Sequence, residues 1–189
     1  MSDSVVQVEV TSEAALWAWL EAHHGQDESV WLVTYKAADA ARYVGREAVL
    51  DALVAYGWVD GRRKVLDGRR TQQLISPRRT QYWAKSYKDR AQRLEEEGRM
   101  RPAGRASVAQ GKASGLWSFM DDVEALVVPE DLQAALEAVE AANWFGTAAP
   151  SYRRNVLRWI KLAKSQSTRA KRIDQVARQA ALGEKVPQL

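Results

Sequence analysis

The hydrophobic and polar positions alternate between helical and strand-like patterns along the first third of the chain. Apolar side chains including Leu16 and Leu20 recur at helical spacing over residues 12–23, which are predicted to form an amphipathic helix. The run 29–36 is rich in β-branched and aromatic residues and predicts a strand buried on both faces. A second apolar stripe predicts a helix over 46–56. Residues 1–10 are predicted to be a short extended lead.

A stretch with turn signals follows, and the fold class depends on it. Asp60-Gly61 and Asp67-Gly68 each predict a turn, and the second is flanked by two strand-like runs. An Asp-Gly pair between such runs favours a type I′ hairpin, which needs positive φ at both central positions. With strand 29–36 this predicts a small antiparallel sheet of about three strands. The predicted class is α+β, with helices covering the sheet and an all-helical C-terminal part.

The second half of the chain shows helical periodicity only. Helices are predicted over residues 80–98, in a short segment within 101–115, over 129–142, and over 151–182 with a break at 165–168. The predicted organisation is an α+β core over residues 1–105 and a helical module over 106–189 that packs on it.

Composition excludes several classes of protein. The 189 residues include no cysteine, and the two histidines are adjacent, so disulfides, thiolate metal sites and His-rich metal sites are not expected. The start of the chain has no export signal and no apolar run approaches the ~20 residues of a membrane helix, which predicts a cytoplasmic protein without a membrane span. No phosphate loop or nucleophile motif occurs, so no cofactor is expected.

Charge is segregated along the chain. Residues 1–60 carry 3 basic and 10 acidic side chains, 61–105 carry 14 and 5, 106–150 carry 1 and 7, and 151–189 carry 10 and 2. Two interpretations stay open: the blocks neutralise one another within the molecule, or the basic blocks form a face for an anionic partner. Arginine forks and aromatic rings interleave near the hairpin, as in surfaces that bind phosphate, carboxylate or nucleic acid.

Asp60 admits two interpretations as well. Carboxylates in Asp-Gly pairs usually accept hydrogen bonds from backbone donors of the turn. The alternative is an enzyme site for a small anionic substrate, built from Asp60, Lys64 and Arg78. A neighbouring cation lowers a carboxylate pKa, which argues against a role as general base near neutral pH.

The central and C-terminal motifs resemble the YdeI/OmpD-associated family. The central run contains GWVDG, SPRR, WAK and GRMRPAG, and the tail contains PSYRR, WIKLAK and TRAKRI. The resemblance implies a bacterial protein of the stress response, associated with protection against bacteriocins and cationic antimicrobial peptides, that has no established reaction. From these matches and the basic blocks, the candidate ligand-binding residues are Trp58, Asp60, Lys64, Arg78, Arg79, Lys85, Arg154, Lys164, Arg169 and Arg172, with no catalytic residue and no metal ligand.

The sequence is therefore compatible with three functions. The first is a non-enzymatic bacteriocin-protection protein that binds an anionic ligand or acidic partner through a basic face. The second is a nucleic-acid-binding protein that uses the same two basic blocks, and the third is the enzyme built on Asp60. The sequence predicts no oligomeric state.

Overall fold

In a computed structural model, which describes residues 5–187, the chain forms two compact units. The first extends to Phe119 and the second begins at Met120. The predicted boundary was residue 105, whereas the helix that contains this residue belongs to the first unit. Each unit is described below by itself. The predicted lead is described from Val5 onward, and residues 1–4 lie outside the described residues.

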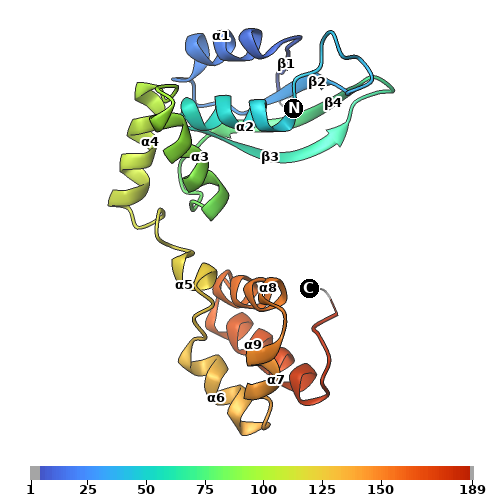
Figure 1. The fold of residues 1–189 in the computed structure, drawn as a ribbon, viewed down its shortest axis with the longest axis vertical. Coiled ribbons are helices and arrows are strands. Elements are labelled where there is room, and N and C mark those ends of the chain that lie inside the picture. The colour runs from blue at the N-terminus through green and yellow to red at the C-terminus, as the bar shows by residue number, and fades with distance from the viewer. Residues whose placement is uncertain (1–4, 188–189) are drawn as a thin grey trace. The chain divides into compact units, whose positions relative to one another are not determined.

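The first unit contains four strands and four helices among its described residues (Figure 1). Its elements are β1 (Gln7–Glu9), α1 (Glu13–His23), β2 (Val30–Tyr35), α2 (Arg46–Ala55), β3 (Trp58–Val65), β4 (Arg70–Pro77), α3 (Lys85–Glu96) and α4 (Pro102–Ala113). Together with the helical second unit, this confirms the predicted α+β class.

The sheet has the order β1-β2-β4-β3. β1 pairs with β2 in parallel, and the other two pairings are antiparallel. The predicted lead therefore contributes a fourth strand and makes the sheet mixed. A strand of three residues has too little periodicity to be recognised as one from its sequence.

The β3–β4 hairpin turns at Asp67-Gly68 as predicted, but it is not a type I′ turn. Neither residue has positive φ. Instead the Asp67 carboxylate accepts hydrogen bonds from the backbone N–H groups of Arg69 and Arg70, both at 2.8 Å. An Asp side chain that bonds to the backbone two residues on forms its own turn, so the backbone does not need the left-handed conformation.

The prediction of another turn at Asp60-Gly61 is wrong. Both residues lie within β3, and the pairing with β4 shifts by one residue between Asp60 and Arg63. This is a β-bulge, in which one extra residue stands on the bulged strand and the side chains that follow change face. An Asp-Gly pair suits a bulge as well as a turn because both need an adaptable backbone.

The core of the first unit lies between one face of the sheet and the helices. Leu16 and Leu20 of α1, the apolar side of α2 and the inward-facing Leu32 and Ile75 of the strands are buried together. Figure 1 shows α1 and α2 side by side next to the strands. Because side chains alternate along a strand, Trp31 and its outward-facing neighbours lie on the opposite face. This face is called the outer face below.

Helix α3 begins later than its apolar stripe predicts. Trp83 precedes the helix, and its ring is buried. Its backbone N–H donates to the carbonyl of Leu116 at 3.0 Å. Gly98 has a φ of 67° and follows the helix end, as predicted. The stretch 101–115, expected to be mostly loop, is largely the regular helix α4, which begins at Pro102. Proline is favoured in the first turn because its missing N–H is not needed there.

The second unit is helical throughout its described residues. Its elements are α5 (Asp121–Glu124), α6 (Glu130–Ala138), α7 (Ala142–Thr147), α8 (Pro150–Lys161) and α9 (Gln166–Ala181). The predicted break at 165–168 is confirmed in part, since Ser165 caps α9 and its hydroxyl accepts from the Thr168 N–H. The helix predicted to continue to residue 142 ends at Ala138, and α7 occupies part of the stretch predicted to be irregular.

Two features are absent from residues 5–187. No helix in that range has the length and apolarity to cross a membrane. The same range contains no group of three or more acidic, histidine or cysteine side chains that could hold a metal ion.

Candidate functional site

The bulge in β3 determines where the cationic side chains of the hairpin point. Asp60 pairs with Ile75 and Arg63 with Gln73, which both face inward. Lys64 pairs with Gln72 and therefore faces outward. Without the extra residue, the side chains after Asp60 would point to the other face of the sheet.

Two of these cations lie over a tryptophan on the outer face. The Lys64 ammonium is 4.5 Å from the centroid of the Trp31 ring, and the Arg62 guanidinium carbon is 5.4 Å from it. Both cationic residues are exposed, whereas Trp31 is only 8% exposed. Among the ion pairs of residues 5–187, none involves Arg62 or Lys64. Within the described part of the chain, the aromatic ring is the partner of both cations, and a ring is a weak partner for an exposed cation.

Asp60 and Lys64 do not meet. The Asp60 carboxylate accepts a hydrogen bond from the Gln73 amide at 2.7 Å on the inner face. Lys64 lies on the outer face, and the sheet separates the two. The register therefore separates Lys64 from Asp60, two of the three residues that the enzyme hypothesis places in one site.

Arg78 is buried beside two aromatic rings. It is 7% exposed, and its guanidinium carbon lies 4.1 Å from the Trp83 ring centroid and 4.9 Å from that of Tyr87. Its Nη1 donates to the carbonyl of Tyr82, while Nε and Nη2 have no hydrogen-bond partner within the described chain. Burial lowers the pKa of Arg78 to about 10, because a charge is less stable away from water. The group remains cationic near neutral pH and organises the segment before α3.

The other predicted residues of the first unit have partners of their own. Trp58 lies in the core, 1% exposed, and its indole N–H donates to the carbonyl of His24 at 3.2 Å. Arg79 forms an ion pair with Asp27 at 2.7 Å, and Lys85 forms one with Asp89 at 2.5 Å. These two cations are exposed, but a neighbouring carboxylate already balances each of them.

Two of the four predicted residues in the second unit are also paired. Arg169 forms a bidentate pair with Asp131 at 2.6 and 2.8 Å. Its side-chain hydrogen bonds lower the pKa of the Asp131 carboxyl. Arg154 lies 3.0 Å from Glu124.

Two predicted residues of this unit have no carboxylate partner among the ion pairs of the described residues. Arg172 donates to the carbonyl of Trp159 and lies 5.0 Å from the centroid of its ring. Lys164 is exposed in the connection between α8 and α9. That the two basic blocks serve one partner stays a prediction.

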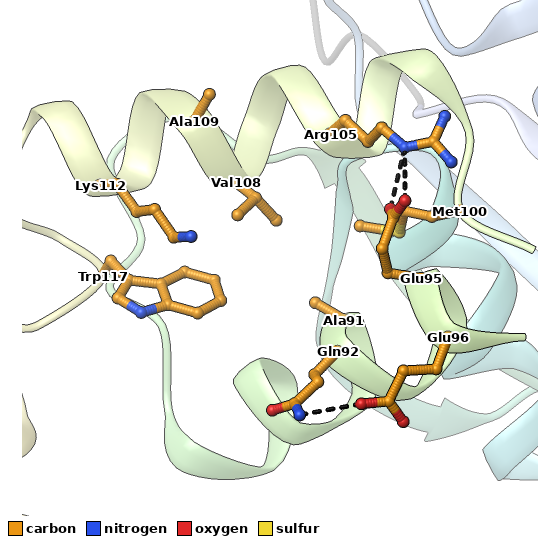
Figure 2. A pocket seen from close by; sticks show the side chains of 10 residues that line it. All are labelled: Ala91, Gln92, Glu95, Glu96, Met100, Arg105, Val108, Ala109, Lys112 and Trp117. Atoms are coloured by element: carbon orange, nitrogen blue, oxygen red, sulfur yellow. Dashed lines mark hydrogen bonds and ion pairs between the residues drawn. The ribbon is translucent and has the colours of Figure 1, made fainter. Parts of the chain in front are cut away.

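The sequence did not predict a cavity of about 540 Å³ in the first unit. It lies between α3 and α4, and Trp117 forms one wall (Figure 2). Apolar side chains that include Met100 and Val108 line its inner part. At one end Arg105 donates to Glu95 at 2.9–3.0 Å, and at the other the Lys112 ammonium lies 5.1 Å from the Trp117 ring centroid.

The cavity could not be predicted from the sequence because its lining residues form no recognisable motif. The only local signals are Gly104 and Gly111, seven residues apart on α4. A Cβ on Gly104 would lie 2.3 Å from the carbonyl oxygen of Ala55, and one on Gly111 would lie 2.4 Å from the Trp83 indole nitrogen. These glycines let α4 approach α2 and Trp83 closely, which leaves its neighbouring surface to face α3 across the cavity.

Comparison with protein families gives two matches. Residues 8–107, more than half of the chain, match the model of a family described as "Domain of unknown function (DUF8412)". Residues 125–183 match the model described as "Bacteriocin-protection, YdeI or OmpD-Associated". The predicted resemblance is thus confirmed in the C-terminal part, while the whole of the central run lies within the other match. No curated protein and no solved structure matches the chain.

Proposed function

We propose that this chain, which belongs to the DUF8412 family and carries a YdeI/OmpD-associated domain over residues 125–183, is a non-enzymatic bacteriocin-protection protein that binds an anionic ligand on the outer face of its sheet. The family description of the C-terminal part supports the role in protection. The outer face of the first unit supports the binding activity. The proposal divides the two tasks between two parts of the chain.

One observation carries the binding proposal. Arg62 and Lys64 stand side by side over Trp31 without a carboxylate partner in the described residues, although Arg79, Lys85 and other cations of the same block are paired. An exposed unpaired cation attracts anions over a distance of about one Debye length, ~8 Å at physiological salt. The arginine adds a planar fork that suits a carboxylate or phosphate.

The geometry favours an acidic ligand over a nucleic acid. Proteins that bind single strands stack bases on exposed aromatic rings. Trp31 is nearly covered, so a base would reach its ring only after both cations had moved aside. A carboxylate can instead contact the two cations where they are. The outer face therefore fits a short acidic peptide or a similar polyanion best.

A charge-reversal experiment tests the proposal. We expect Arg62→Glu/Lys64→Glu to weaken binding of a fluorescently labelled deca-aspartate peptide at least about tenfold in fluorescence anisotropy, because like charges across an interface are strongly unfavourable. Cells that express this variant at the normal level should also lose protection against a bacteriocin. An oligonucleotide of equal charge should bind more weakly than the peptide.

The matched control changes the same charges elsewhere. Lys164→Glu/Lys171→Glu alters two exposed lysines of the second unit and should weaken binding by less than about threefold through long-range charge alone. Equal losses in both double variants would contradict the assignment to the outer face. Preferential binding of the oligonucleotide, with a salt slope of about 0.7 per phosphate contact, would favour the nucleic-acid alternative instead.

A further inference from the structure

The cavity between α3 and α4 has the size and lining of a small-molecule site. Its volume of about 540 Å³ falls within the ~300–1,000 Å³ that is typical of ligand pockets. Ala91 and Met100 at its base are each 4% exposed, and Val108 and the Trp117 ring extend this apolar surface outward. A few polar groups stand around it, as in sites that fix the orientation of a mostly apolar ligand.

The two ends of the cavity differ in charge, because the cation at one end is paired with a carboxylate and the cation at the other end is not paired within the described chain. Arg105 and Glu95 neutralise each other at one end. Glu96 accepts a hydrogen bond from the Gln92 amide, and Figure 2 shows both at the edge of α3. Lys112 stands at the other end, and Figure 2 shows its ammonium group directed toward the cavity beside Trp117. No ion pair of the described residues includes Lys112, and its ammonium group instead contacts this ring.

This arrangement selects one kind of occupant. An apolar body would displace water from the surface formed by Met100, Val108 and Trp117. A carboxylate at one end of that body would form a charge-assisted hydrogen bond with Lys112, which is about twice as strong as a neutral one. An amine at the same end would meet the ammonium group with like charge.

We propose that the cavity between α3 and α4 binds a small amphiphile with an apolar body and one terminal carboxylate, which Lys112 recognises. This site is separate from the outer face of the sheet, because none of its lining residues belongs to a strand. The two sites can therefore be tested independently. Arg62→Glu/Lys64→Glu should leave ligand binding in the cavity unchanged.

The test uses octanoate, octanol and octylamine as probes of equal chain length. In a ¹⁵N-labelled full-length protein, the indole signal of Trp117, assigned with Trp117→Phe, should shift on titration with octanoate. Octanol should bind about tenfold more weakly and octylamine more weakly still. Absence of a Trp117 shift with octanoate, or equal affinity for all three probes, would overturn the proposal.

Two variants locate the binding. Lys112→Met should reduce octanoate affinity about tenfold and leave octanol affinity unchanged, since it removes the charge but keeps an apolar side chain. Ala109→Trp should fill the cavity from its exposed edge and abolish binding of both probes.

Ala106→Trp is the matched control for cavity filling. Ala106 is an exposed residue of the same helix that does not line the cavity, so its substitution should leave binding intact. Equal binding in both tryptophan variants would show that octanoate binds elsewhere. A loss of dispersion in the indole signals would reveal that Ala109→Trp disturbs the fold. In that case Lys112→Met still tests the proposal.

Discussion

Strand β3 and helix α3 are both rich in cationic side chains, but the structure gives these side chains different surroundings. On the helix side, Arg90 and Arg93 of α3 and Arg99 from the segment after it converge on Asp51 of α2, which is 7% exposed. On the strand side, Arg62 and Lys64 lie over the Trp31 ring and have no carboxylate partner among residues 5–187. The first set joins two helices, and the second is exposed to solvent.

A stretch of sequence that is rich in cationic residues therefore need not form one exposed basic surface. Residues 61–105 contain both sets, so their composition suggests one charged surface. Position relative to the acidic residues of other elements decides which cations are neutralised. The α3 cations should therefore matter for stability and the β3 cations for binding. Each prediction below probes this contrast.

The largest expected effect is on the helix side. Asp51→Asn should lower the free energy of unfolding by about 3 kcal/mol, because removing one partner of a buried charge cluster leaves the others uncompensated. Urea unfolding followed by circular dichroism measures the change. Asp89→Asn, which breaks the exposed pair with Lys85, should cost less than about 1 kcal/mol. Similar values for both variants would contradict the structural role of the cluster.

The second expected effect concerns the close packing of α4 on α2. Gly104→Ala should lower the free energy of unfolding by about 1–3 kcal/mol, because the new methyl group would meet the backbone of Ala55 and Val54, which cannot move aside cheaply. The methyl group also favours the helix by about 1 kcal/mol, which the clash must exceed. Thermal and urea unfolding measure the sum.

Gly146→Ala is the matched control for this prediction. Gly146 lies in α7 with nothing within 4 Å of an added Cβ, so the same substitution there should be neutral or slightly stabilising. A stabilised Gly104→Ala variant would mean that α4 does not pack on α2 as closely as described. The helix side would then lose one of the contacts that distinguish it from the open strand side.

Many of the helices and strands behind this contrast could be predicted from the sequence. The predictions that were wrong have physical reasons. Long apolar periodicities located α1, α2 and β2 because a buried face leaves a repeating signature. The bulge in β3 was interpreted as a turn because an Asp-Gly pair is compatible with either structure. Only the pairing with β4 distinguishes a bulge from a turn here. That single residue decides that Lys64 faces outward and Asp60 inward.

The candidate site was less predictable than the fold. The sequence drew attention to the basic hairpin, but it could not show that Arg79 would be paired with Asp27, fifty-two residues away. Trp31 was assigned only to a buried strand, although its outward ring now lies under two cations. Pairings over such separations depend on tertiary structure, which local patterns do not contain.

The smallest predicted effect concerns Glu9, which together with Asp67 balances Arg70, a cation of β4. Glu9 of β1 accepts a hydrogen bond from the Tyr35 hydroxyl and forms an ion pair with Arg70 at 2.6 Å. These contacts, the tyrosine hydroxyl first, lower the pKa of Glu9 below its ordinary value of 4.5. Glu9→Gln should therefore cost stability above pH 4.5. Because both side chains are more than a third exposed, the cost should be less than about 1 kcal/mol.

The sign of the pH dependence makes this prediction specific. The folded-state pKa of Glu9 is lowered, so the wild-type advantage over Glu9→Gln is present at pH 7 and is lost as the pH falls through that pKa. Urea unfolding of both proteins at pH 7 and pH 3 measures the difference, with Glu28→Gln, an exposed residue, as the control. Loss of Glu9 also removes one of the two carboxylates that balance Arg70, so the variant should bind the deca-aspartate peptide more tightly at pH 7. Weaker binding would mean that Arg70 does not share the outer face with Arg62 and Lys64, and the contrast between the strand side and the helix side would rest on two cations alone.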